Sequence, residues 1–161
     1  MITLRTFAER FKRGCSENYL LLGGTGLGKT HLSTSLAKTV IERGYDVVYT
    51  TVINMLDDFE RKRFSSQNAD TEHLTDRYFE CDLLIIDDLG CELSTQFTVS
   101  SLYNLINTRL NEGSSTVLNT NLSPDELQKR YDNRITSRIL GNFSPLLFRG
   151  EDIRLQKLMG K

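Results

Sequence analysis

Short apolar or β-branched runs alternate with segments of helical periodicity along most of this chain. The runs predict strands at 19–22, 47–52, 83–86, 115–120 and 145–148. Apolar residues three or four apart predict helices at 4–13, 29–43, 53–64, 71–80, 95–111 and 133–140. The sequence Ser123-Pro124 predicts a further helix start, with Ser123 as the N-cap and proline at the first helical position. Strands that alternate with helices indicate a parallel sheet covered on both faces, which is a three-layer αβα sandwich.

The carboxyl ends of such strands are where open α/β sheets bind their ligands. Three predicted loops follow strand ends: 23–30, 87–90 and 119–123. Each of them contains polar or glycine-rich sequence directly after buried residues. We therefore expect the functional chemistry to be concentrated in these three loops.

The first loop reads GGTGLGKT and matches the G-x-x-x-x-G-K-[ST] pattern in full. Glycines let backbone N–H groups curl around phosphate oxygens, and the following helix adds a favourable dipole. Lys29 is expected to reach the β- and γ-phosphates, and the Thr30 hydroxyl to ligate Mg²⁺. The alternative is a glycine-rich turn without a ligand. The predicted nucleotide contacts are Gly23, Gly24, Thr25, Gly26, Leu27, Gly28, Lys29, Thr30 and His31.

Two carboxylates follow the third predicted strand, whose sequence is LLII. Strand placement beside the glycine-rich loop puts Asp87 near the expected Mg²⁺, and Asp88 near the γ-phosphate. Asp88 is then the candidate general base that orients the attacking water. A solvated turn before Gly90 is the alternative for this pair.

Polar residues that end the fourth strand, and arginines downstream, complete the candidate chemistry. Asn121, with Asn119 as second choice, is positioned to bridge the attacking water and the γ-phosphate; a helix-capping turn is the alternative. Arg134 and Arg138 share one face of a predicted helix. An arginine supplied in trans stabilises phosphoryl transfer, whereas spacing alone favours a solvated basic face.

Composition and charge narrow the class of protein. The chain has 161 residues and a net charge of -1, so no global field draws it toward nucleic acid or membrane. The three cysteines form no CxxC pair, which argues against a disulfide framework and a zinc site and predicts buried or partly buried thiols. No signal peptide and no bilayer-length apolar run is present, so a cytoplasmic location is expected.

The segments GGTGLGKTHL, DLLIIDDLG, NTNLS and YDNRITSRIL, in this order and spacing, resemble AAA+ ATPases of the DnaC/DnaI helicase-loader group. The resemblance covers about residues 15 to 157 and extends to IstB-type transposition relatives. It implies one AAA+ domain over 1–161, with a P-loop sheet of ASCE type in the order 5-1-4-3-2. It also implies that no full C-terminal lid is present, and that a partner-binding domain precedes this region.

The resemblance also assigns roles by motif position. Asn121 matches sensor 1, Arg138 matches the arginine finger that reaches a neighbouring subunit's ATP, and Arg134 is its companion. Arg154 corresponds to a sensor 2 position. Most AAA+ proteins carry glutamate where this chain has Asp88, which is one methylene shorter, so slow hydrolysis is expected.

Partners follow from the same resemblance. The group loads a replicative DnaB-type helicase, and its segment equivalent to 53–80 contacts single-stranded DNA. Arg61, Lys62 and Arg63 form a basic cluster there that suits phosphates. A solvated helix end is the alternative, because Asp57, Asp58 and Glu60 lie alongside.

Four functions remain open at this point. The first is an ATP-dependent helicase loader that self-assembles through Arg138. The second is an IstB-type transposition helper that prefers duplex DNA, and the third is a small-molecule kinase, against which the two carboxylates and the polar strand-four end argue. The fourth is an ATP-binding interaction module that does not hydrolyse the nucleotide.

Overall fold

The computed structural model describes residues 2–64, 73–150, 152 and 153. Its centre is one sheet of five parallel strands in the order β2-β3-β4-β1-β5. The strands are β1 (Tyr19–Leu22), β2 (Val47–Thr51), β3 (Leu83–Leu89), β4 (Ser115–Thr120) and β5 (Ser144–Leu147). From the opposite edge this order is 5-1-4-3-2, so the predicted topology is confirmed.

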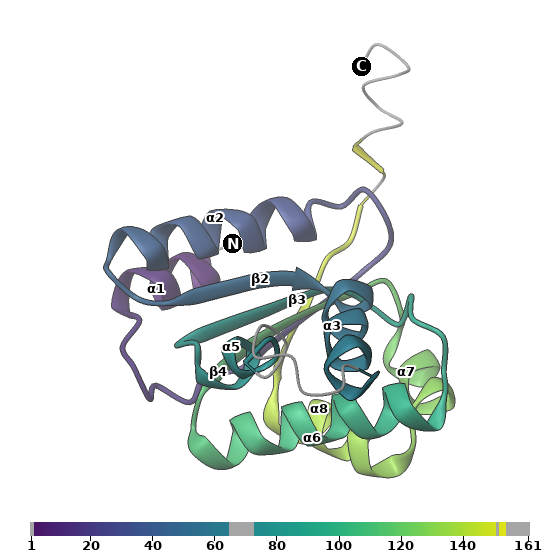
Figure 1. Ribbon diagram of the computed structural model, residues 1–161. Helices are drawn as coiled ribbons and strands as arrows, with labels where there is room; N and C mark the ends of the chain where they lie inside the picture. Colours follow the sequence, from purple (N-terminus) through teal and green to yellow (C-terminus); the bar gives the residue numbers. More distant parts are fainter. Residues whose placement is uncertain (1, 65–72, 151, 154–161) are drawn as a thin grey trace.

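Helices cover both faces of the sheet and form the outer layers of the predicted sandwich (Figure 1). The first pair, α1 (Ile2–Arg10) and α2 (Lys29–Glu42), lies on one face, and α3, α5, α6 and α8 lie on the other. The remaining bounds are α3 (Val52–Phe64), α5 (Asp76–Glu80), α6 (Gln96–Glu112), α7 (Pro124–Arg130) and α8 (Asn133–Asn142).

Two hydrophobic clusters fill the spaces between the layers. Leu20 and Leu22 of β1 face the cluster that includes α3, α6 and α8, whereas Tyr19 and Leu21 face α1 and α2. β3 divides in the same way, because successive side chains of a strand point to opposite faces. A strand buried on both faces must be apolar at every position, which explains the uninterrupted LLII run.

Three element boundaries depart from the prediction by three residues or more. β3 continues past Ile86 to Leu89, because Asp87 still pairs with Thr51 of β2 before the register with β4 shifts. The helix predicted at 71–80 begins only at Asp76; residues 71 and 72 lie outside the described residues. The first helix ends at Arg10, three residues earlier than predicted. The predicted cap at Ser123, with Pro124 in the first helical position, is confirmed.

The cysteines are all free thiols. Cys81 is buried and Cys15 partly buried, as predicted, but Cys91 is exposed because it lies in the turn after β3. Within the described ranges, every helix is too short or too polar to cross a bilayer.

Candidate nucleotide-binding site

The loop 23–28 joins the buried end of β1 to the first turn of α2, which confirms the predicted strand–loop–helix context. Gly26 and Gly28 have φ values of 69° and 88°, a left-handed region that side chains with Cβ rarely adopt. The helix then starts at Lys29, so its first N–H groups, including that of His31, have no partner within the helix. The loop and this helix terminus together form a backbone arrangement suited to anions.

Lys29 lies on the inner side of this loop and is 7% exposed. Its Nζ donates to Gly23 O at 2.5 Å, to Gly24 O at 2.7 Å and to Asn121 Oδ1 at 2.7 Å. Burial lowers the pKa of Lys29, while Asp87 and Asp88 act in the opposite direction. The Lys29 ammonium group thus lies near the carboxylates at the end of β3, at the same edge of the sheet.

Asp87 is buried at the end of β3, with 4% of its surface exposed. Its Oδ2 accepts a hydrogen bond from Tyr49 OH at 2.6 Å. Its Oδ1 accepts from Asn119 Nδ2 at 3.1 Å and from the Asp88 N–H at 2.9 Å. Neighbouring strands on both sides therefore hold this carboxylate, and burial raises the pKa of Tyr49 so that its phenol remains a donor.

Asp88 faces solvent although it adjoins the buried Asp87. Its φ of 56° places it in the left-handed region, at the shift in register between β3 and β4. The backbone then turns, and the Cys91 N–H donates to Asp88 O at 3.1 Å. This conformation directs two consecutive carboxylates differently, one into the sheet and one outward, which suits two different chemical roles.

Both candidate asparagines lie at the end of β4, and the structure gives them different neighbours. Asn121, the first choice, is exposed and contacts Lys29. Asn119 is fully buried and donates to Ser33 Oγ at 2.8 Å as well as to Asp87. Its Oδ1 is buried and accepts no hydrogen bond from the described residues. A buried oxygen without a donor beside a carboxylate is a feature of sites that hold water or a hydrated cation.

Arg138 and Arg134 lie together on α8, where both guanidinium groups cover the ring of Tyr103 from α6, at 4.9 Å and 5.4 Å. Arg138 Nε also donates to Asn107 Oδ1 at 2.7 Å. Arg134 differs because it forms an ion pair with Asp132 at 2.9 Å. Both arginines contact residues of α6 or of the start of α8. The sensor 2 position, Arg154, lies outside the described residues.

Two residues near the site, Tyr49 and Glu92, belong to none of the predicted motifs. Thr51 of β2 pairs with Asp87, and Tyr49 lies two residues before Thr51. Strand alternation therefore places the Tyr49 side chain on the same face of the sheet as Asp87. Glu92 is buried, accepts from the Tyr131 hydroxyl and from the Gly90 N–H, and ties the turn after Asp88 to the end of α7. The pKa of Tyr131 is raised mainly because the phenol is buried, and its hydrogen bond to Glu92 raises it further.

The chain after β5 runs along the P-loop. The Phe148 N–H donates to Leu22 O at 2.7 Å, and the Ile153 N–H donates to Gly26 O at 3.1 Å. A Cβ on Gly26 would lie 1.8 Å from Asp152 Oδ1. The left-handed φ of 69° favours glycine at position 26, and any added Cβ would require the Asp152 side chain to move.

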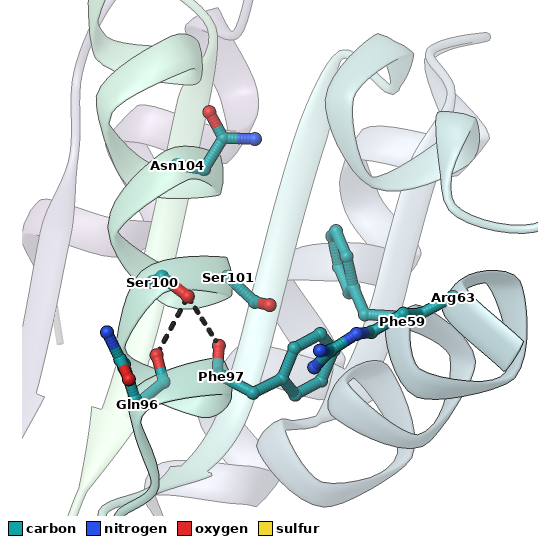
Figure 2. Close-up of a pocket in the computed structure, with 7 residues that line it drawn as sticks. All are labelled: Phe59, Arg63, Gln96, Phe97, Ser100, Ser101 and Asn104. Carbon is teal, nitrogen blue, oxygen red and sulfur yellow. Dashed lines mark hydrogen bonds between the residues drawn. The ribbon is translucent and has the colours of Figure 1, made fainter.

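The basic cluster at the end of α3 is divided by its contacts. Lys62 Nζ lies 3.1 Å from both Thr75 Oγ1 and Asp76 Oδ1, and Arg61 approaches Asp58 at 4.0 Å. Arg63 instead points toward α6, with its guanidinium 5.1 Å from the ring centroid of Phe97 (Figure 2). There it borders a hollow of about 520 Å³ between α3 and α6. The hollow is lined by Phe59, Arg63, Gln96, Phe97, Ser100, Ser101 and Asn104.

Comparison with known proteins agrees with this arrangement. Residues 7–157 match the family described as IstB-like ATP binding protein. The chain is 34% identical over 128 residues to the chromosomal replication initiator protein DnaA of Aliarcobacter butzleri, covering 79% of this chain and 28% of that protein. It is 25% identical over 158 residues to the replicative helicase loader DnaC of Escherichia coli strain K12, covering 98% of this chain and 63% of that protein.

Solved structures show the same fold. A crystal structure of the DnaC helicase loader superposes with a TM-score of 0.78 at 24% identity, covering 92% of this chain and 87% of that one. DnaA from Aquifex aeolicus bound to AMPPCP superposes with a TM-score of 0.79 at 21% identity, covering 99% and 50%. The chain thus spans 28% to 63% of the length of the curated relatives it matches.

Proposed function

The chain belongs to the family of IstB-like ATP-binding proteins, and we propose that it binds Mg·ATP at residues 23–30. Slow hydrolysis of the bound ATP would control how the protein assembles on DNA. The observation that carries the proposal is the convergence of three strand ends. Lys29 reaches Asn121 after β4, while Asp87 at the end of β3 is held by Tyr49 and Asn119. A glycine-rich turn without a ligand would not need these side chains to meet.

The residues present suit magnesium as well as a triphosphate. Mg²⁺ prefers oxygen ligands and is commonly held by one or two carboxylates together with substrate phosphates. The Thr30 hydroxyl and the Asp87 carboxylate would hold it, and the orphan Asn119 Oδ1 next to Asp87 suits its hydration shell. Among the described residues no three His, Cys, Asp or Glu side chains form a separate metal cluster. The bound ion would neutralise charge on the β- and γ-phosphates.

In the proposed reaction, the loop amides and Lys29 bind the triphosphate. Asp88 takes the proton of a water molecule that attacks the γ-phosphorus, and the bond to the β-phosphate oxygen breaks to release ADP. The Asn121 amide, already beside Lys29, orients that water. The short side chain of Asp88 and its exposed position are consistent with slow turnover.

Arg138 is the proposed finger for the ATP of a neighbouring copy. Arg138 contacts two neutral residues, Asn107 and Tyr103, whereas Arg134 is paired with the carboxylate of Asp132. An incoming phosphate meets less competition at a guanidinium that has no carboxylate partner among the described residues. This contrast favours Arg138 over Arg134, and self-assembly would then be coupled to ATP.

Single-stranded DNA is the proposed nucleic-acid partner, and Arg63 is its favoured contact among the three basic residues of α3. Lys62 and Arg61 are already close to carboxylates, whereas Arg63 lies beside Phe97 at the rim of the hollow in Figure 2. Aromatic surfaces next to arginine suit unpaired bases and phosphates. One solved relative is a DnaA bound to AMPPCP and single-stranded DNA.

Helicase loading is the proposed purpose of the switch, since the DnaC relative is described as a replicative helicase loader. The partner would be a replicative DnaB-type helicase. We assign residues 1–161 to one AAA+ domain and the docking of the helicase to a partner-binding domain outside them. An IstB-type transposition helper is the alternative, and preference for duplex over single-stranded DNA would favour it.

Calorimetry with Mg·ATP tests the central claim. Wild type is expected to give a binding signal that Lys29→Ala abolishes, because the loop then loses its only cation. Lys38→Ala is the matched control: it removes an exposed lysine from the same helix, three turns from the loop, and should bind normally. Equal binding by wild type and Lys29→Ala would contradict the proposal. Binding without any hydrolysis would leave an ATP-dependent interaction module as the function.

A further inference from the structure

Asp87 is connected to α2 through the hydroxyls of Tyr49 and Ser33, neither of which takes part in the proposed reaction. The Tyr49 hydroxyl, which donates to Asp87 Oδ2, lies 3.3 Å from Ser33 Oγ. Ser33 in turn accepts from Asn119 Nδ2, which also donates to Asp87 Oδ1. These four side chains form a closed ring drawn from β2, β3, β4 and α2.

The ring reaches the turn of α2 that begins the helix. Ser33 Oγ lies 3.2 Å from Thr30 O and 3.0 Å from Lys29 O, to which it can donate. Thr30 and Asp87 are the two residues proposed to hold magnesium. The Tyr49 and Ser33 hydroxyls therefore lie between the strand that carries one proposed ligand and the turn that carries the other.

The two oxygens of Asp87 are held in different ways. Oδ1 has two donors, of which one is the backbone N–H of Asp88, whereas Oδ2 has the phenol of Tyr49. At 2.6 Å this phenol bond is within the range of strong, charge-assisted O–H···O⁻ bonds. Rotation of a carboxylate about its last torsion is otherwise soft, so a donor on the second oxygen fixes the plane of the group.

We propose that Tyr49 is a positioning residue for magnesium, which holds Asp87 Oδ2 relative to the Thr30 turn and thereby sets the metal affinity of the nucleotide site. Hydrogen-bond partners of ligating carboxylates commonly change metal affinity by about 10- to 100-fold when they are removed. The inference rests on the proposed function, because it requires a site that binds nucleotide together with Mg²⁺.

The test measures nucleotide binding rather than turnover. A fluorescent, non-hydrolysable ATP analogue is titrated into the full chain, first in EDTA and then over a range of Mg²⁺ concentrations. Tyr49→Phe keeps the ring and removes the hydroxyl. It is expected to raise, roughly 10-fold or more, the Mg²⁺ concentration that gives half of the maximal increase in affinity for the analogue. The affinity for the analogue in EDTA should stay at the wild-type value, because the loop and Lys29 are intact.

Two further variants sharpen the comparison. Tyr45→Phe removes the same hydroxyl group from a tyrosine that packs on Phe11 and is not one of the four hydrogen-bonded side chains. It should leave the Mg²⁺ dependence unchanged. Ser33→Ala removes the hydroxyl whose partners among these four side chains are Tyr49 and Asn119 rather than Asp87, and should have a smaller effect than Tyr49→Phe. An equal effect of Ser33→Ala would overturn direct positioning by Tyr49.

The remaining outcomes also decide the matter. An unchanged or lower Mg²⁺ requirement in Tyr49→Phe overturns the inference, and so does an equal loss of affinity with and without the metal, which would mean general damage. Wild-type protein that shows no Mg²⁺-dependent binding contradicts the proposed function itself. The two failures are thus distinguishable.

Discussion

Lys29 Nζ lies 2.7 Å from Asn121 Oδ1, although 92 residues separate them along the chain. The contact joins the loop after β1 to the end of β4, and β1 and β4 are adjacent strands. It exists because both strands run in the same direction and end at the same edge of the sheet. The proposed roles of both residues depend on this edge.

Asn121→Ala is expected to lower ATP hydrolysis on the order of 100-fold, the typical cost of losing one preorganised polar group at a reacting centre. ATP affinity should stay near wild type, because the loop amides and Lys29 remain. Steady-state hydrolysis and nucleotide titration measure the two effects. Asn104→Ala, on the exposed side of α6, is the control. A loss of affinity equal to the loss of rate would assign Asn121 to binding alone.

Asp88→Asn tests the proposed general base. Asparagine tolerates the left-handed φ of 56° at this position, so the fold should be retained. Hydrolysis is expected to fall by roughly 10²- to 10⁴-fold, since an amide cannot take the proton of the attacking water. Single-turnover hydrolysis and thermal unfolding together provide the measurement. A variant that hydrolyses ATP at the wild-type rate would remove Asp88 from the mechanism.

Arg138→Ala is expected to lower hydrolysis by about 10³-fold or more in assembled protein, with ATP binding by single subunits unchanged. Arg134→Ala should have a weaker effect, because Arg134 is paired with Asp132. Mixing offers a direct test of action in trans. Arg138→Ala subunits and Lys29→Ala subunits should each be inactive alone. In a mixture, the intact loop of an Arg138→Ala subunit can face the intact arginine of a Lys29→Ala subunit, so hydrolysis should be partly restored. A mixture without recovered activity argues against the finger.

Arg63→Ala is expected to weaken binding of a single-stranded oligonucleotide and to lower the salt dependence of binding by about one counterion. Phe97→Ala should weaken binding by roughly 5- to 160-fold if a base stacks on the ring, since stacking contributes about 1–3 kcal/mol per base. Fluorescence anisotropy at several salt concentrations measures both. Arg61→Ala is the control, because this side chain lies near Asp58 instead of the hollow.

Asp132 caps α8, the helix that carries Arg138: its Oδ1 accepts the Ile135 N–H at 3.0 Å. This backbone hydrogen bond is the main cause that lowers the pKa of Asp132 below its ordinary value. A carboxylate with a lowered pKa in the folded state stabilises above its unfolded pKa. That contribution is lost as pH falls below about 4, through the folded pKa.

The cap gives a pH-dependent prediction. Asp132→Ala should cost about 1 kcal/mol at neutral pH, as for other N-cap residues. Asp132→Asn retains a cap and should unfold near the wild-type temperature at pH 7, yet lose less stability between pH 5 and 3. Thermal unfolding across this range provides the measurement. Parallel curves for wild type and Asp132→Asn would contradict the assignment.

Local sequence was sufficient for most of the sheet. The LLII run, the GGTGLGKT loop and the Ser123–Pro124 cap each have the predicted structure, because period, glycine content and capping are properties of neighbouring residues. Boundaries were less accurate where tertiary pairing overrides the pattern. Asp87 belongs to β3 only because Thr51 of β2 pairs with it.

Local patterns were enough to predict a P-loop, two carboxylates and two asparagines at strand ends. The folded arrangement was needed to show that Asn121 contacts Lys29 whereas Asn119 contacts Asp87, and that Tyr49 donates to this carboxylate. It also separated Arg63 from Lys62, although they are adjacent in sequence. The physical reason is that contacts between strands depend on register and on how helices pack against the sheet, and neither is encoded by neighbours in the chain.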